Sequence, residues 1–178
     1  MRILLFITAL FAAGLSIKPV FAASGDEEVF AAFEWFCLSH LQKPESIEQL
    51  FPPLGIQPLP QDKAEAFLAP QKGKAWLMPG SVTKGFVVTL TDSGVCTVNG
   101  SYANGKETQS IFEKNTKNIK LASEAAGSQT QDMYAVTFHD AKSGDMAKTL
   151  VSITTSNLKS IDGIILSTLP EKLALENN

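Results

Sequence analysis

The chain has 178 residues, with 15 basic and 18 acidic side chains and a net charge of −3. That length suits one domain of ordinary size. An acidic chain without a basic cluster is not expected to bind nucleic acid or anionic lipid surfaces, because both attract positive charge.

The first 22 residues predict an export signal. Met1-Arg2 supplies a positive start, an uncharged and mostly apolar run follows over Ile3–Ile17, and the small Ala22 suits a cleavage position. The run of 15 residues is shorter than the roughly 20 that span a bilayer. We therefore predict cleavage after Ala22 and not a membrane anchor. A lipid anchor is not expected either, because the first cysteine is Cys37, well beyond the apolar run.

Cleavage leaves residues 23–178, a chain of 156 residues with a net charge of about −5. No later segment is long and apolar enough to span a bilayer. The sequence thus predicts a single domain that is soluble in the periplasm after cleavage.

A helix is expected at the start of the mature chain. Ser24 and Glu27 form a capping box, in which each side chain binds a backbone N–H of the other residue. Apolar residues then recur at helical spacing up to Leu41, and Pro44 ends the helix. A shorter helix is predicted over residues 45–51. The stripe comprises Phe30, Phe33, Cys37 and Leu41, with Val29, Phe36 and His40 beside it.

The next part of the chain begins with a proline-rich segment and continues with residues that alternate with the period of two typical of strands. Four of the ten residues over 51–60 are proline, which predicts an extended connector. One helical turn is expected over residues 63–68. A short strand follows at residues 75–77, and a hairpin joins strands at 86–91 and 95–98 through the turn Asp92-Ser93-Gly94.

The second half of the chain is predicted to be mostly strands. A helix is expected over residues 106–116, and residues 119–125 alternate weakly. Residues 140–145 are expected to form a loop. Residues 163–168 favour a last strand, with a helix as the alternative, and the tail after Pro170 is expected to fray. The strand faces are marked by Tyr134, Val136 and Phe138, and by Thr149, Val151 and Ile153.

This order of elements is typical of the α+β class, because it lacks the regular alternation of a parallel sheet. We expect the N-terminal helices to pack on one face of a mainly antiparallel sheet. The other face is expected to be open to solvent or to a partner.

Two cysteines in an exported chain favour one disulfide, here Cys37–Cys96. The bridge would join the first helix to the second strand of the hairpin. The alternative, two buried free thiols, suits a reducing compartment. A redox catalyst is not expected, because the chain has no C-x-x-C pair.

Candidate site residues are few. His40 and His139 have no partner at metal-ligand spacing, so no metal or cofactor is expected. His139 next to Asp140 could serve a serine, but the chain has no G-x-S-x-G turn. Trp35 and Trp76 are both expected in the core, and either becomes a candidate for binding if it is exposed.

Three short motifs resemble a group of small uncharacterised exported proteins of the Gram-negative envelope. They are Phe33-Glu34-Trp35-Phe36-Cys37, Gly73-Lys74-Ala75-Trp76 and Gly94-Val95-Cys96, and they lie in the first half of the mature chain. The resemblance implies an envelope location and a disulfide. It implies no catalytic residue.

The sequence therefore favours a non-enzymatic binding or interaction module of the cell envelope. Its partner would be an envelope protein or a small ligand. One alternative is a hydrolase with a dispersed site that includes His139 or His40. Another is an immunity protein that neutralises an exported effector.

Overall fold

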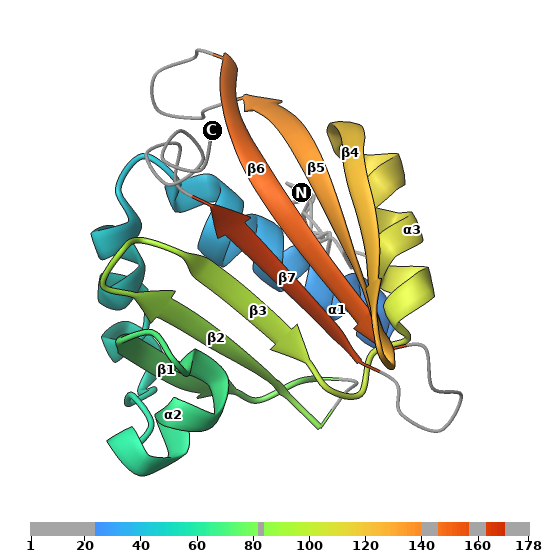
Figure 1. Ribbon diagram of the computed structural model, residues 1–178. Helices are drawn as coiled ribbons and strands as arrows, with labels where there is room; N and C mark the ends of the chain where they lie inside the picture. Colours follow the sequence, from blue (N-terminus) through green and yellow to red (C-terminus); the bar gives the residue numbers. More distant parts are fainter. Residues whose placement is uncertain (1–23, 82–83, 140–145, 157–162, 170–178) are drawn as a thin grey trace, which may run out of the picture.

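The protein is described by a computed structural model, in which residues 24–81, 84–139, 146–156 and 163–169 are placed (Figure 1). The predicted export signal, the loop over 140–145 and the tail after Pro170 lie outside the described residues.

A seven-stranded antiparallel sheet forms the centre of the fold, with helices on its faces (Figure 1). The expected α+β class is confirmed. Two antiparallel groups, β1-β2-β3 and β4-β5-β6-β7, meet where β3 pairs with β7, so the strand order is β1-β2-β3-β7-β6-β5-β4. The strands are β1 (Gly73–Met78), β2 (Phe86–Thr91), β3 (Cys96–Gly100), β4 (Lys117–Ala126), β5 (Gln129–His139), β6 (Met146–Ser156) and β7 (Ile164–Leu169).

The first helix begins and continues as the sequence predicts. The capping box is present: Ser24 Oγ accepts from the Glu27 N–H at 3.2 Å, and Glu27 Oε2 accepts from the Ser24 N–H at 2.8 Å. The α-helical part α1 (Gly25–Ala32) passes directly into a π-helical turn η1 (Phe33–Cys37) and a 3-10 turn η2 (Leu38–His40). The helical segment therefore ends at His40, shortly before Pro44, as the sequence predicts.

The other helical segments are shorter. The helix expected at 45–51 is a 3-10 helix, η3 (Pro44–Leu50), and the proline-rich segment opens with a second 3-10 turn, η4 (Pro52–Leu54). Only the rest of that segment is irregular. Proline fixes φ near the helical value and lacks the N–H that the first turn leaves unpaired, so it suits the start of such turns. α2 (Gln61–Leu68) and α3 (Gly105–Asn115) complete the set.

Helices cover the two faces of the sheet unequally. α1, η1 and α3 pack on the face that carries the main core, while α2 covers only β1 and β2 on the opposite face, through Ala64 and Leu68 against Ala75 and Val87. The rest of the opposite face, over β3, β7, β6 and β5, has mostly half-exposed side chains. The expected open face is thus present, but α2 covers one end of it. None of the helices in the described ranges is long and apolar enough to cross a bilayer.

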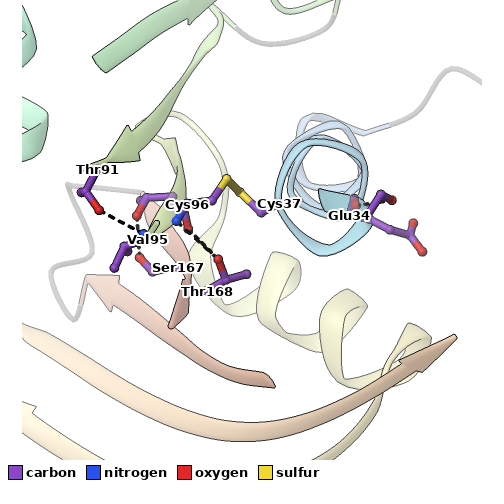
Figure 2. Close-up of a disulfide and its surroundings, with 9 residues drawn as sticks. Glu34, Cys37, Thr91, Val95, Cys96, Ser167 and Thr168 are labelled. Carbon is purple, nitrogen blue, oxygen red and sulfur yellow. Dashed lines mark hydrogen bonds between the residues drawn. A yellow bond between two sulfur atoms is a disulfide. The ribbon is translucent and has the colours of Figure 1, made fainter. Parts of the chain in front are cut away.

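The predicted disulfide joins the helical layer to the sheet. Cys37 in η1 is bonded to Cys96 at the start of β3, with 5.4 Å between the Cα atoms (Figure 2). Thr168 on the neighbouring strand β7 holds Cys96 in place: its hydroxyl accepts from the Cys96 N–H at 3.4 Å and donates to the Cys96 carbonyl at 3.3 Å. Both cysteines are buried, so the bridge is part of the core.

A column of three aromatic rings packs the helical layer against β1. Phe51 lies between Phe36 and Trp76, with ring centroids at 5.2 Å and 4.2 Å and planes within 9° of parallel. All three side chains are buried, so the expected core position of Trp76 is confirmed. Because the buried Phe51 directly precedes η4, it anchors that turn to the core.

Candidate binding cavity

A cavity lies between the end of the first helical segment and the sheet. Its volume is about 720 Å³. It is bounded by η1, η2 and the chain up to Ser46 on one side, and by the end of α3 and the ends of β4, β5 and β6 nearest to it on the other. The residues that line it include Glu34, Trp35, Leu38, His40, Leu41, Lys43, Ser46, Lys117, Val136, Phe138 and Met146.

Trp35 stands at this cavity and is 51% exposed. The expectation that it lies in the core was wrong. Phe33, Phe36 and Cys37 are buried, whereas the intervening Trp35 stays exposed at the cavity. Its ring packs against the neighbouring Phe36, at 4.8 Å between centroids and a tilt of 47°. A large aromatic side chain is therefore held at the rim of the cavity by its own helix.

The rest of the apolar lining comes from both layers. Leu38 and Val136 are buried and form the floor, while Phe138 and Leu41 are half-buried. Met146 is 56% exposed. When a ligand covers large apolar side chains that line a cavity and contact water, apolar surface is removed from water, and this favours binding. The cavity therefore has the composition of a site for an apolar group.

His40 is held by a short chain of hydrogen bonds at the cavity wall. The Ser46 hydroxyl donates to the Lys43 carbonyl at 2.7 Å, and His40 Nδ1 lies 2.8 Å from the same hydroxyl oxygen. A hydroxyl has one proton, so His40 Nδ1 is the donor in the second bond. This direction is the reverse of the one in which a histidine accepts the proton of a nucleophilic serine.

The charged lining residues are Glu34, Lys43 and Lys117, and all three are exposed. Two ammonium groups against one carboxylate leave an excess of one positive charge at the rim. At these exposed positions the attraction is screened by water and salt, so it can favour an anionic group on a ligand only modestly.

The other two predicted site residues, Trp76 and His139, are placed differently from Trp35 and His40. Trp76 is buried in the aromatic column and does not line the cavity. His139 is the last residue of β5 and pairs in register with Met146, so its backbone lies at the margin of the cavity. The structure thus brings Trp35 and His40 to one cavity and places the backbone of His139 near it.

A separate polar cluster lies between α3 and strands β4 and β5, with Asp132 and Tyr134 buried and Lys120 exposed. Gln109 Nε2 donates to Asp132 Oδ2 at 2.6 Å and to the Tyr134 hydroxyl at 2.7 Å, and Lys120 Nζ lies 2.8 Å from Asp132 Oδ2. Burial raises the pKa of Asp132, but these hydrogen bonds outweigh it, and the pKa lies below its ordinary value. Burial, together with the hydrogen bond to Glu113, raises the pKa of Tyr134. The hydrogen bonds of Gln109 and Glu113 fix α3 to the sheet through an ionised Asp132 and a neutral Tyr134.

Nothing in the sequence pattern singled out this cluster. Asp132 and Tyr134 lie on one face of a strand, and their partners are far away in the chain. Within the described ranges, no group of three or more histidine, cysteine, aspartate or glutamate side chains could hold a metal ion.

Comparison with known proteins adds no relative. No protein family, curated protein or solved structure matches the chain.

Proposed function

We propose that the protein is an exported, non-enzymatic binding module of the Gram-negative cell envelope and that its cavity takes a small apolar ligand. The observation that carries this proposal is the exposed Trp35 beside a cavity with an apolar floor. A volume of about 720 Å³ falls in the range of about 300–1,000 Å³ in which small-molecule sites lie. Tryptophan is also one of the residue types enriched among those that supply most of the binding energy.

The envelope location is supported by two independent features. Residues 1–22 have the sequence of an export signal, with the cut predicted after Ala22. The Cys37–Cys96 bridge suits the oxidising periplasm and not the cytosol. Detection of the intact precursor in the cytosol of the producing bacterium would contradict this part of the proposal.

The ligand class follows from the lining. An apolar body fits among Trp35, Leu38, Leu41 and Met146, and an anionic group is favoured over a cationic one by the excess of lysine at the rim. We therefore choose decanoate as the probe, with decylamine as the cationic counterpart. Calorimetric titration of the purified protein should show binding of decanoate, and weaker binding of decylamine.

Trp35→Ala provides the test of place. A ligand that covers the Trp35 ring should lose about 1.4 kcal/mol when the ring is removed, so decanoate should bind about tenfold more weakly. Tyr102→Ala is the matched control, because Tyr102 is a 58% exposed aromatic residue that does not line the cavity. Equal affinity of the two variants, or no binding of decanoate by the wild type, would refute a ligand in this cavity.

A further inference from the structure

The two edges of the sheet differ in how they are covered. At β1, the proline-rich segment runs along the outer edge, and the Leu59 N–H donates to the Ala75 carbonyl at 2.8 Å. At the other end of the sheet is β4 (Figure 1). In the part of the chain that is described, β4 pairs only with β5, and no other segment bonds to its outer edge.

β4 is also long and carries exposed apolar side chains. It has ten residues, of which all but the half-buried Asn118 are exposed. Ile119 is 70% exposed and Leu121 is 57% exposed. A long edge strand with apolar side chains and unpaired backbone groups is a surface on which another strand can add.

A β-bulge gives this strand an unusual distribution of side chains. The register against β5 shifts between Lys120 and Ala122. Lys117, Ile119, Ala122 and Glu124 therefore pair with Thr137, Ala135, Met133 and Gln131, which alternate along β5. Because alternate residues of a strand point to one face, all four β4 residues share a face. In a regular strand, residues 117 and 124 would lie on opposite faces.

We propose that β4 pairs with β4 of a second copy, antiparallel, so that the two sheets form one continuous sheet. In the register that places Lys117 opposite Glu124, Ile119 lies opposite Ala122, and the two-fold axis repeats both pairs. Lys117 of each copy thus lies opposite Glu124 of the other copy. Opposite charges and apolar residues directly across two strands stabilise a pair, and like charges destabilise it.

The remaining charge of the strand does not oppose this arrangement. Lys120 is engaged with Asp132 on the core face. Within the described ranges, Lys117 and Glu124 form no salt bridge of their own. They are therefore available to the second copy. A strand of unrelated sequence would need a negative charge opposite Lys117 and a positive charge opposite Glu124 to pair as well.

Two single charge reversals test the pairing and its register. In Lys117→Glu, two glutamates face each other at both pairs, and in Glu124→Lys two lysines do so. Sedimentation equilibrium should show the wild type dimerising and each variant dimerising about tenfold more weakly, as expected for two pairs that change from attraction to repulsion. An equal mixture of the two variants should recover the wild-type association, because every pair in the mixed dimer again joins opposite charges.

The readout is the state of association measured without a ligand, so it is separate from the decanoate titration, although Lys117 also lines the cavity. Both substituted residues are exposed, and thermal melting should confirm that the variants fold like the wild type. Three results would overturn the proposal: a wild type that stays monomeric at about 1 mM, single variants that associate as the wild type does, or a mixture that does not recover association.

Discussion

Removal of the disulfide is expected to be among the most destabilising single changes to this protein. The bridge closes a loop of 59 residues, which contains the aromatic Phe51, α2, β1 and β2. Loop-closure entropy for that length gives about 4 kcal/mol of stability, because the unfolded chain with the bridge has fewer conformations. For a domain of this size, 1 kcal/mol shifts the melting temperature by about 2–4 °C. Reduction should therefore lower it by about 8–16 °C.

Urea unfolding followed by tryptophan fluorescence measures this difference directly. The oxidised protein and the same protein with dithiothreitol should differ by about 4 kcal/mol in the free energy of unfolding. The double variant Cys37→Ala/Cys96→Ala is the control, because it has no bridge to reduce. Its stability should not respond to dithiothreitol, and it should lie somewhat below the reduced wild type, since both sulfur atoms are buried and their removal leaves a void.

Unfolding of the oxidised and reduced wild type at the same urea concentration would show that the bridge does not stabilise the fold. An alanine variant that responds to the reductant as strongly as the wild type would show that the effect arises elsewhere.

Two further predictions concern the core. Phe51→Ala should destabilise the protein by about 3–5 kcal/mol in urea unfolding, because it empties the centre of the aromatic column, while Phe67→Ala, at a 38% exposed position, should cost less than about 1 kcal/mol; similar costs would contradict the packing argument. Asp132→Asn should cost about 1.5–3 kcal/mol at neutral pH, because it replaces the carboxylate that binds Lys120 and Gln109. The lowered pKa of Asp132 means that this stability is present above the ordinary value of 3.8 and is lost as the pH falls through the folded pKa, so the difference between wild type and variant should shrink in acid. A difference that stays constant down to pH ~2 would show that the ionised form is not the stabilising one.

Much of the secondary structure could be predicted because its signals are local. The hairpin around Asp92-Ser93-Gly94 combines a turn with two alternating runs, and it is present as β2 and β3. The capping box at Ser24 is present as well. The last strand, β7, confirms the strand interpretation of 163–168 over the helical one. In each case, residues close together in the chain determine the backbone conformation.

The misplacement of Trp35 shows how residue type can mislead. The apolar stripe that predicted the first helix did not include Trp35, and the buried residues Phe33, Phe36 and Cys37 follow that stripe. Spacing therefore placed Trp35 on the outer side. The expectation of a core position rested only on the size of an aromatic side chain, and spacing was the better guide.

The cavity and β4 could not be derived from the sequence for a different reason. The cavity is assembled from segments that are about 100 residues apart, such as Trp35 and Met146, and the contact depends on tertiary packing. Residues 117–126 alternate only weakly because nearly every side chain of β4 is exposed on both faces, so no burial pattern is imposed on them.

The position of the sulfur bridge has a consequence for degradation. The proline-rich segment lies between Cys37 and Cys96, so a protease that cuts it opens a ring and does not separate the chain. The N-terminal fragment, with α1, remains covalently attached to β3 and keeps its place in the core. Release of that helix requires a reductant as well as a protease, and a nicked molecule keeps its full mass in a gel until it is reduced.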